Sequence, residues 1–320
     1  MEELYKPLRS LRKKSLYLAY SGGSDSSAML HAMHSVGLKD VQCVYVDHGW
    51  SELGQQWKIW CQKQVERYGY HFTSFSIQAR NMEGEGLEDA SRKGRYECLS
   101  SVLDAHSVMC VAQHADDQAE TLLIQLLRGK GVEGLAGMPR SQPLGKGTML
   151  RPWLDVGKDT ITQYIHKHSI EYIDDPSNAD THLDRNFIRH HIIPAMKEHR
   201  WIQAPKLIAR TAEHLQAHLL VQKDWYVMKK KECSVNGQVS VRKLRSMEAP
   251  VLSTFIKMWL EDEHDTHPTK LACDLITHSI LQKKGGVTIQ WEKGQAFIKG
   301  DTIEVQKLNN FSEDACMLSP

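Results

Sequence analysis

Residues 16–26, Leu-Tyr-Leu-Ala-Tyr-Ser-Gly-Gly-Ser-Asp-Ser, decide the fold of this chain. The apolar run from Leu16 to Tyr20 predicts a buried strand, and it stops abruptly at the polar segment Ser21–Ser26. A helix-like pattern follows. A strand, a glycine-rich turn and a helix N-terminus form a phosphate-binding geometry, because glycines let backbone N–H groups approach an anion and the helix dipole adds positive potential. The alternative is an ordinary turn with a serine N-cap.

The phosphate-binding interpretation also indicates a metal ion. A carboxylate beside phosphates repels them unless a cation lies between, so Asp25 points to Mg²⁺. The segment is not a Walker loop, since the chain contains no Gly-Lys-[Ser/Thr] at the required spacing. It also lacks a lysine, so the positive charge must come from backbone, metal or residues elsewhere. The predicted nucleotide-binding residues are Ser21, Gly22, Gly23, Ser24, Asp25 and Ser26.

Composition and charge exclude several classes of protein. The chain has 320 residues, enough for two domains, and its net charge of +1 excludes a globally basic surface for nucleic acid. No apolar run approaches the roughly 18 residues of a membrane span, and the N-terminus does not resemble a secretory signal. The seven cysteines form no Cys-x-x-Cys pair. A soluble protein of the reducing cytoplasm is expected.

Strand and helix signals alternate through the first part of the chain, which predicts an α/β fold with an open parallel sheet flanked by helices. Strands are expected at 16–20, 41–46, 71–77 and 108–112, and helices at 25–36, 52–68, 87–105, 116–128 and 157–168. A long helix at 206–231, shorter ones at 248–262 and 268–282, and hairpin strands at 287–291 and 295–298 follow. We therefore expect a catalytic domain at 1–205 and a smaller helical and hairpin domain at 206–320.

A second polar segment, residues 112–121, follows the fourth expected strand. Acidic side chains at a helix N-terminus are favoured by about 0.3–1 kcal/mol, so simple capping would explain them. Asp117 and Glu120, however, are three residues apart and project from one helix face, with His114 one turn earlier. That pattern is typical of a hard-cation site with an acid–base group. If the first and fourth strands flank the point where strand order reverses, both polar segments face one crevice.

Two further segments leave alternatives open. Glu88, Arg92 and Arg95 form one stripe of a helix, which is either a solvated salt-bridged face or a source of positive charge for an α-phosphate or a substrate carboxylate. The second segment contains Arg185, Asn186 and Arg189. These side chains suit contacts to phosphates or bases, and they would equally well pin their loop to the domain.

With these segments together, the chain resembles the tRNA(Ile)-lysidine synthetases, a family of the N-type ATP pyrophosphatase (PP-loop) superfamily. Ser21–Ser26 matches the superfamily loop Ser-Gly-Gly-x-Asp-Ser. The fold implied is that of the adenine nucleotide alpha hydrolases. Within residues 16–195, further segments match the narrower family in order: Val46-Asp47-His48-Gly49, Glu88 to Tyr96, His114 to Thr121, Leu127-Arg128-Gly129-x-Gly131, Gly134 to Met138, and Asp175 to Arg189.

The resemblance implies a two-step ligation. ATP adenylates the C2 oxygen of the wobble cytidine in the isoleucine tRNA with anticodon CAU, and free lysine then displaces AMP to give lysidine. The implied catalytic residues are Asp25, Arg92, Arg95, His114, Asp117 and Glu120. Mg²⁺ would be held by Asp25 and Asp117. Lysine or tRNA would contact Glu88, Asp117, Glu120, Arg185, Asn186 and Arg189. The division of acidic roles between metal and lysine stays open.

The resemblance also bears on partners and on alternative functions. Longer family members carry an additional C-terminal domain, which this chain is expected to lack, and a homodimer is one way for the short form to span a tRNA. How the methionine tRNA with the same anticodon is rejected stays open. The alternatives are a related PP-loop enzyme that thiolates tRNA or forms amides, and a noncatalytic RNA-binding module. Thiolating relatives are expected to carry Cys-x-x-Cys pairs, which this chain lacks.

Overall fold

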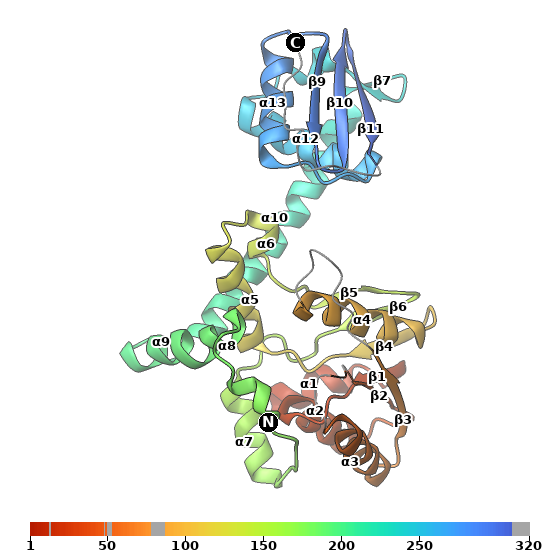
Figure 1. Ribbon diagram of the computed structural model, residues 1–320, viewed down its shortest axis with the longest axis vertical. Helices are drawn as coiled ribbons and strands as arrows, with labels where there is room; N and C mark the ends of the chain where they lie inside the picture. The colour runs from red at the N-terminus through yellow and green to blue at the C-terminus, as the bar shows by residue number, and fades with distance from the viewer. Residues whose placement is uncertain (13, 48, 50–52, 78–86, 309–320) are drawn as a thin grey trace. The chain divides into compact units, whose positions relative to one another are not determined.

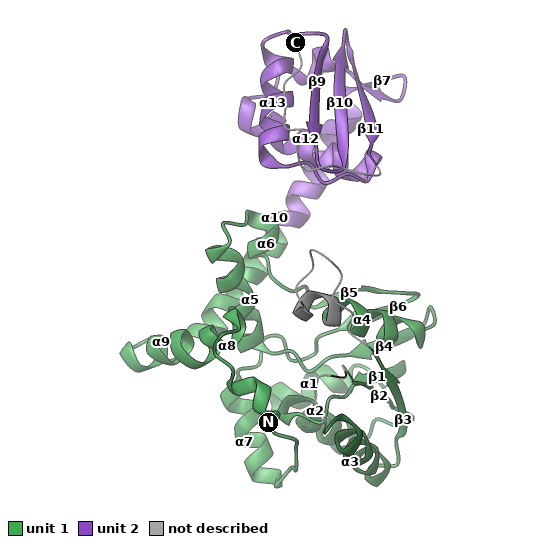
Figure 2. Ribbon diagram, viewed as in Figure 1, with its two compact units in different colours: residues 1–217 green, residues 218–320 purple. Residues whose placement is uncertain are grey.

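The computed structural model describes residues 1–12, 14–47, 49, 53–77 and 87–308, with backbone alone for 87–91. The chain divides into two compact units, unit 1 at residues 1–217 and unit 2 at residues 218–320 (Figure 2). The division falls inside the long helix α10 (Ala204–Cys233). The sequence-based limit at 205/206 lies at the start of that helix, so residues 206–217 belong to the first compact unit.

Unit 1 contains a six-stranded sheet with the order β3-β2-β1-β4-β6-β5 (Figure 1). All neighbouring strands are parallel except β5, which pairs with β6 in antiparallel fashion through a tight turn containing Gly145. The predicted α/β fold with a mostly parallel sheet is confirmed. The strands are β1 (Ser15–Ala19), β2 (Gln42–Asp47), β3 (His71–Ser76), β4 (Ser107–Cys110), β5 (Ser141–Leu144) and β6 (Gly147–Leu150).

Helices cover both faces of this sheet because its strands carry apolar side chains on both sides. Leu16 and Leu18 of β1 join one core with residues of α1, α2, α3 and α7, whereas Tyr17 packs on the opposite face against a core that includes Leu99 of α4. Figure 1 shows α2 and α3 on one side and α4 on the other. These helices are α1 (Glu2–Arg9), α2 (Ser24–Ser35), α3 (Gly54–Arg67), α4 (Leu87–Ser101) and α7 (Lys158–His168).

The strand order places the two polar segments together. β1 and β4 are adjacent and parallel, with Leu18 paired to Cys110, and β1 also pairs with β2 on its other edge. The chain therefore reverses its strand order between β1 and β4. Because the loop after β1 leads into α2 and the segment after β4 leads into α5 (Ala115–Leu127), both leave the sheet at the same carboxyl edge. The predicted switch point is confirmed.

The remaining elements of unit 1 include a helical run that the sequence did not predict. It starts at α8 (Asp184–Phe187), continues as a π-helical segment, η2 (Ile188–Ile192), and ends with α9 (Ile193–His199). Ile188 and Ile193 pack against Ala119 of α5, which docks this run onto the acidic helix. Two short elements, α6 (Val132–Leu135) and the 3₁₀ turn η1 (Pro176–Ala179), complete the unit.

Unit 2 has its own core. Buried side chains such as Phe255, Ile276 and Ile289 pack together between helices and a three-stranded antiparallel sheet of order β11-β10-β9. The predicted hairpin strands correspond to β9 and β10. The elements that follow α10 are β7 (Ser234–Val235), β8 (Gln238–Val239), α11 (Val241–Leu244), α12 (Ala249–His264), α13 (Lys270–Leu281), β9 (Val287–Trp291), β10 (Gly294–Lys299) and β11 (Thr302–Lys307). Across the described residues of the chain, no helix is both long and apolar enough to cross a membrane.

Candidate active site

The loop after β1 has the backbone that a phosphate-binding turn requires. Gly22 has a φ of +79°, a conformation that side-chain-bearing residues rarely adopt, and Gly23 is the N-cap of α2. A Cβ on Gly22 would lie 2.7 Å from the Cys61 Sγ atom. The hydroxyl of Ser26 donates to the Gly23 carbonyl at 3.0 Å. The turn is thus fixed by its own side chains, and the first-turn N–H groups of α2, which have no partner within a helix, lie beside it.

Asp25, in the first turn of α2, lies between two cationic groups. Lys158 Nζ is 2.5 Å from its Oδ1 atom, and His114 Nε2 is 3.5 Å from its Oδ2 atom. Burial raises the pKa of this carboxyl, but the contacts with His114 and Lys158 outweigh burial and lower the pKa to about 2. Asp25 is therefore ionised at neutral pH and compensated by neighbours from α5 and α7.

His114 is the buried centre of the cluster, with only 3% of its surface exposed. Its Nε2 atom is 3.5 Å from both Asp25 Oδ2 and Asp117 Oδ2. The buried Nδ1 atom has no hydrogen-bond partner within the described residues and faces Asp116 Oδ2 at 3.9 Å. Burial lowers the pKa of His114, but the charges of Asp117 and Asp25 outweigh it and raise the pKa to about 9. The site thus holds an imidazolium at neutral pH, which is a cation and an acid rather than a base.

Asp117 and Glu120 share one helix face, as their spacing predicts, and Arg189 bridges them. Its Nε and Nη2 atoms donate to Glu120 at 2.7 and 2.9 Å, and Nη2 also donates to Asp117 Oδ1 at 3.2 Å. Glu120 is 1% exposed, and burial raises its pKa although Arg189 opposes that effect. Arg189 lies in the π-helical segment, a distortion that is frequent at functional sites.

The neighbours of Arg189 fix their own segment to the domain. The Asn186 side-chain amide donates to the carbonyls of Ser177 and Asp180 at 3.1 and 2.9 Å. Arg185 Nη2 donates to the Thr121 hydroxyl at 3.1 Å, on the same face of α5 as the acidic pair. Of the two interpretations left open by the sequence, these contacts favour the structural one for Asn186. For Arg185 and Arg189, a contact with tRNA or lysine stays a prediction.

The three predicted residues of α4 stay untested. Arg92 and Arg95 lie on this helix with exposed side chains, and both interact with neighbours. The side chain of Glu88 lies outside the described residues. In the contacts described above, Asp25 is paired with Lys158 of α7 and with His114 at the start of α5, and Glu120 is paired with Arg189 of η2. A role for Arg92 or Arg95 at the α-phosphate is still a prediction.

Two residues that contact the predicted site segments were not predicted from the sequence. Lys158, the first residue of α7, reaches Asp25 and also donates to the Ser24 hydroxyl at 2.9 Å. Arg151, just after β6, is buried and donates to Gln113 Oε1 at 2.6 Å, which supports the residue before His114. Arg151 stands between apolar residues and a proline, and Lys158 is followed by Asp159 and Thr160, which are ordinary residues for the first turn of a helix. The sequence around Gly157 predicts that a helix starts near Lys158. It does not predict that the Lys158 side chain contacts the loop after β1.

The oxygen ligands of this site fit an Mg²⁺ ion that binds together with the nucleotide. No group of three or more acidic, histidine or cysteine side chains among the described residues forms a complete metal site. Mg²⁺ usually binds through one or two carboxylates together with phosphate oxygens and waters. Asp25 and Asp117 supply two carboxylates around one histidine, since each lies 3.5 Å from His114 Nε2. These residues fit a cation that phosphates would help to hold.

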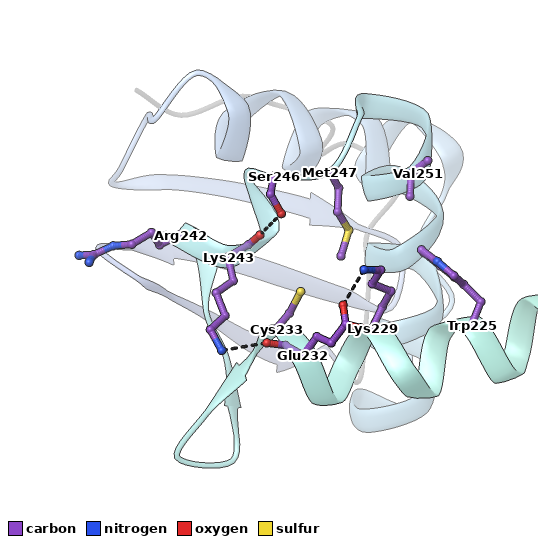
Figure 3. A pocket seen from close by; sticks show the side chains of 9 residues that line it. All are labelled: Trp225, Lys229, Glu232, Cys233, Arg242, Lys243, Ser246, Met247 and Val251. Carbon is purple, nitrogen blue, oxygen red and sulfur yellow. Dashed lines mark hydrogen bonds and ion pairs between the residues drawn. The ribbon is translucent and has the colours of Figure 1, made fainter.

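A separate hollow lies in unit 2. This cavity has a volume of about 510 Å³. Figure 3 shows the residues that line it, which include Trp225, Cys233 and Met247. Its lysines are engaged with the protein, because Lys229 pairs with Glu232 at 2.5 Å and Lys243 donates to the Glu232 carbonyl at 2.8 Å. None of the predicted site residues is among those that line this cavity.

Fold and site together define a class of protein. A mostly parallel sheet, with a Ser-Gly-Gly-x-Asp-Ser loop after one central strand and an acidic helix N-terminus after its neighbour, is the architecture of an α/β nucleotide-binding domain. The chain belongs to the PP-loop domain family, whose model matches residues 1–196. Membership of this family implies that the domain binds ATP.

Curated relatives are consistent with one another. The chain is 38% identical over 226 residues to the tRNA(Ile)-lysidine synthase of Alkalilimnicola ehrlichii, a match that covers 69% of this chain and 51% of that protein. It is 29% identical over 310 residues to the tRNA(Ile)-lysidine synthase of Legionella pneumophila strain Lens, covering 92% of this chain and 70% of that protein. The chain thus spans about half the length of the first relative.

Among solved structures, the chain is similar to the U34-tRNA thiolase NcsA from Methanococcus maripaludis. The TM-score is 0.55, with 15% sequence identity, and the match covers 68% of this chain and 78% of that one. At this identity the likeness supports the fold alone.

Proposed function

We propose that this chain forms lysidine in the isoleucine tRNA with anticodon CAU. The observation that carries the proposal is the cluster of Asp25, His114, Asp117 and Glu120 beside the PP-loop. That cluster sits in a chain aligned over 310 residues with a protein named tRNA(Ile)-lysidine synthase. Unit 1 would be the catalytic part. We assign tRNA contacts to the smaller C-terminal part.

In the first step, the C2 oxygen of cytidine attacks the α-phosphorus of ATP, and pyrophosphate leaves. The loop and the N-terminus of α2 would hold the β- and γ-phosphates through backbone N–H groups. Asp25 and Asp117 would hold Mg²⁺, which when bound neutralises the charge that develops on the leaving pyrophosphate. His114 Nε2, which lies 3.5 Å from both carboxylates, would position them for the cation. Arg92 or Arg95 would meet the α-phosphate.

In the second step, the ε-amine of lysine attacks C2, the bond from C2 to the bridging oxygen breaks, and AMP leaves. Free lysine has a pKa of about 10.4, so the ammonium must be bound and lose a proton. Glu120 suits this role best among the described acids, because its buried carboxyl has a raised pKa and lies beside Asp117. Glu88, from α4, would assist in holding the ammonium.

The tRNA partner would meet local basic groups, since the net charge is only +1. In unit 2, Lys230 is already paired with Asp262 and Glu263, and Arg245 donates to the Ile280 carbonyl. The tRNA would therefore contact other exposed lysines of this unit, such as Lys283 and Lys284. A homodimer that presents two such surfaces stays part of the proposal, and its test is the mass of the protein in solution.

The test is transfer of labelled lysine. The full chain is incubated with ATP, Mg²⁺, radiolabelled lysine and a transcript of the CAU isoleucine tRNA. We expect label in the tRNA at the wobble cytidine, together with one AMP and one pyrophosphate for each lysine. The methionine tRNA with the same anticodon, and the isoleucine tRNA with uridine at the wobble position, serve as controls and should stay unlabelled.

The variant Asp25→Asn tests the assignment of the site. Loss of this carboxylate should reduce tRNA-dependent pyrophosphate release by roughly 100-fold or more. A folded variant with full activity would remove Asp25 from the mechanism. Absence of lysine transfer by the wild-type chain, with sulfur or ammonia transferred to tRNA instead, would assign the chain to a different PP-loop reaction.

A further inference from the structure

The phosphate-binding loop contains no lysine, yet the structure brings one to it. Lys158 lies 133 residues after Asp25, and its Nζ atom contacts the Asp25 carboxylate at 2.5 Å and the Ser24 hydroxyl at 2.9 Å. Both contacts are with the first turn of α2, where the nucleotide phosphates of a PP-loop domain would bind. The Lys158 ammonium therefore lies at the N-terminus of α2, the end of a helix that binds anions.

The position of Lys158 is set by several independent contacts. Its backbone N–H donates to Asp116 Oδ2 at 2.8 Å, and the Ala115 N–H donates to the Val156 carbonyl at 2.9 Å. These bonds attach the start of α7 to the start of α5. Further along α7, the Tyr164 hydroxyl lies 2.6 Å from His31 Nδ1 on α2. The lysine thus stands on a helix that is held against both polar segments of the site.

The side chain of Lys158 remains accessible to a ligand. About a third of its surface, 34%, is exposed, and the Asp25 side chain is 30% exposed. A lysine ammonium is a point charge on a flexible stem with three donors, so it can exchange a carboxylate for a phosphate oxygen without moving its helix. In Walker loops, a lysine within the loop itself reaches the β- and γ-phosphates.

We propose that Lys158 is the phosphate-binding lysine of this loop, supplied by α7 instead of by the loop sequence. Without nucleotide it neutralises Asp25. In the ATP-bound state, Asp25 would hold the divalent cation, and Lys158 Nζ would move from Asp25 to the β- and γ-phosphate oxygens. The inference rests on the nucleotide-binding part of the proposed function and is independent of the tRNA and lysine steps.

The test compares nucleotides that have and lack the outer phosphates. The variant Lys158→Met should weaken binding of ATP and of pyrophosphate by roughly 10- to 100-fold, measured by calorimetry with Mg²⁺ and without tRNA. Binding of AMP should change less than about twofold, because AMP has no β- or γ-phosphate. Lys158→Arg should restore most of the ATP affinity. Lys167→Met, on an exposed position of the same helix, is the matched control and should bind ATP normally.

A second measurement uses the wild-type chain and needs no variant to fold. An amine-reactive reagent labels lysines, and mass spectrometry reads the extent of labelling at Lys158. ATP with Mg²⁺ should protect Lys158 at least severalfold, whereas AMP should not. Equal losses of AMP and ATP affinity in Lys158→Met, or equal protection by both nucleotides, would overturn the inference. The two proposals can fail separately. If the wild-type chain does not transfer lysine but Lys158→Met loses affinity for ATP and not for AMP, the proposed function is contradicted and this inference stands.

Discussion

At the scale of single residues, the site is a set of buried or half-buried charges that compensate one another. Asp25 faces Lys158 and His114, Asp117 faces His114 and Arg189, and Glu120 faces Arg189. A buried charge without a partner is costly, so each acid keeps a cation. Both proposed ligands, Mg²⁺ and the lysine ammonium, are cations themselves. They can replace protein cations without leaving any carboxylate unpaired.

The pair of Arg189 and Glu120 gives a test of this balance. Arg189→Met removes the guanidinium and leaves Glu120, which is almost fully buried, without its closest cation. We expect a loss of about 2–4 kcal/mol in the free energy of unfolding at pH 7, because breaking a buried pair leaves an uncompensated charge. Chemical denaturation measures this loss. Arg185→Met is the comparison, since its Nε atom is 3.7 Å from Glu120, and it should cost less than about 1 kcal/mol.

The double variant with Glu120→Gln completes the thermodynamic cycle. Because a neutral side chain at position 120 no longer needs the guanidinium, Arg189→Met should cost clearly less in that background, with a coupling of about 1–3 kcal/mol. Additive effects of the two substitutions would show that Arg189 stabilises the segment by packing alone. Such a result would contradict the charge balance described here.

At the scale of elements, the loop between β1 and α2 depends on one backbone conformation. Gly22 needs its positive φ, and an added Cβ would meet the Cys61 Sγ atom at 2.7 Å and the Ile173 Cδ1 atom at 2.8 Å. At Gly23, where φ is −70°, the nearest atom to an added Cβ would be the Ser21 hydroxyl oxygen at 3.5 Å. A side chain at position 22 would therefore strain the loop, whereas a side chain at position 23 would fit.

Alanine at each position is the corresponding experiment. Gly22→Ala should lower the free energy of unfolding by about 1–3 kcal/mol through backbone strain and the two close contacts. It should also weaken ATP binding, since the loop must shift. Gly23→Ala should leave the fold within about 0.5 kcal/mol of wild type. Thermal unfolding with and without ATP measures both effects, and equal behaviour of the two variants would contradict the assigned loop geometry.

The sequence predicted the elements whose signals are local. β1 and β4 are apolar runs that end at polar residues, and the acidic face of α5 follows from the spacing of Asp117 and Glu120. The hairpin β5–β6 was missed because its strands have four residues each and β5 contains Pro143. The sequence could not predict that Lys158 contacts Asp25 or that Arg189 contacts Glu120. The two pairs are 133 and 69 residues apart, and a single basic residue is compatible with many roles. Charge compensation is a long-range property of the fold.

At the scale of the whole molecule, the chain has separate hydrophobic cores in its two units. One set of buried side chains, including Met109 of β4, belongs to unit 1, and another, including Phe255 of α12, belongs to unit 2. The helix α10 runs through the division between them. Since cooperative unfolding follows a shared core, a chain with two cores need not unfold in one step.

Calorimetry with one core substitution in each unit tests this division of stability. Phe255→Ala should destabilise the transition of unit 2 by about 3–5 kcal/mol, and Met109→Ala should destabilise that of unit 1 by about 2–5 kcal/mol. ATP at 100 times its dissociation constant should stabilise only the transition that Met109→Ala shifts, by about 2.7 kcal/mol, because the loop, Lys158 and the acidic cluster all lie in unit 1. In the Phe255→Ala variant the affinity for ATP should therefore be unchanged, while tRNA binding should fall if the smaller unit contacts tRNA as proposed. A single transition that both substitutions and ATP move together would instead mean that the two cores unfold as one, with α10 as the element that couples them.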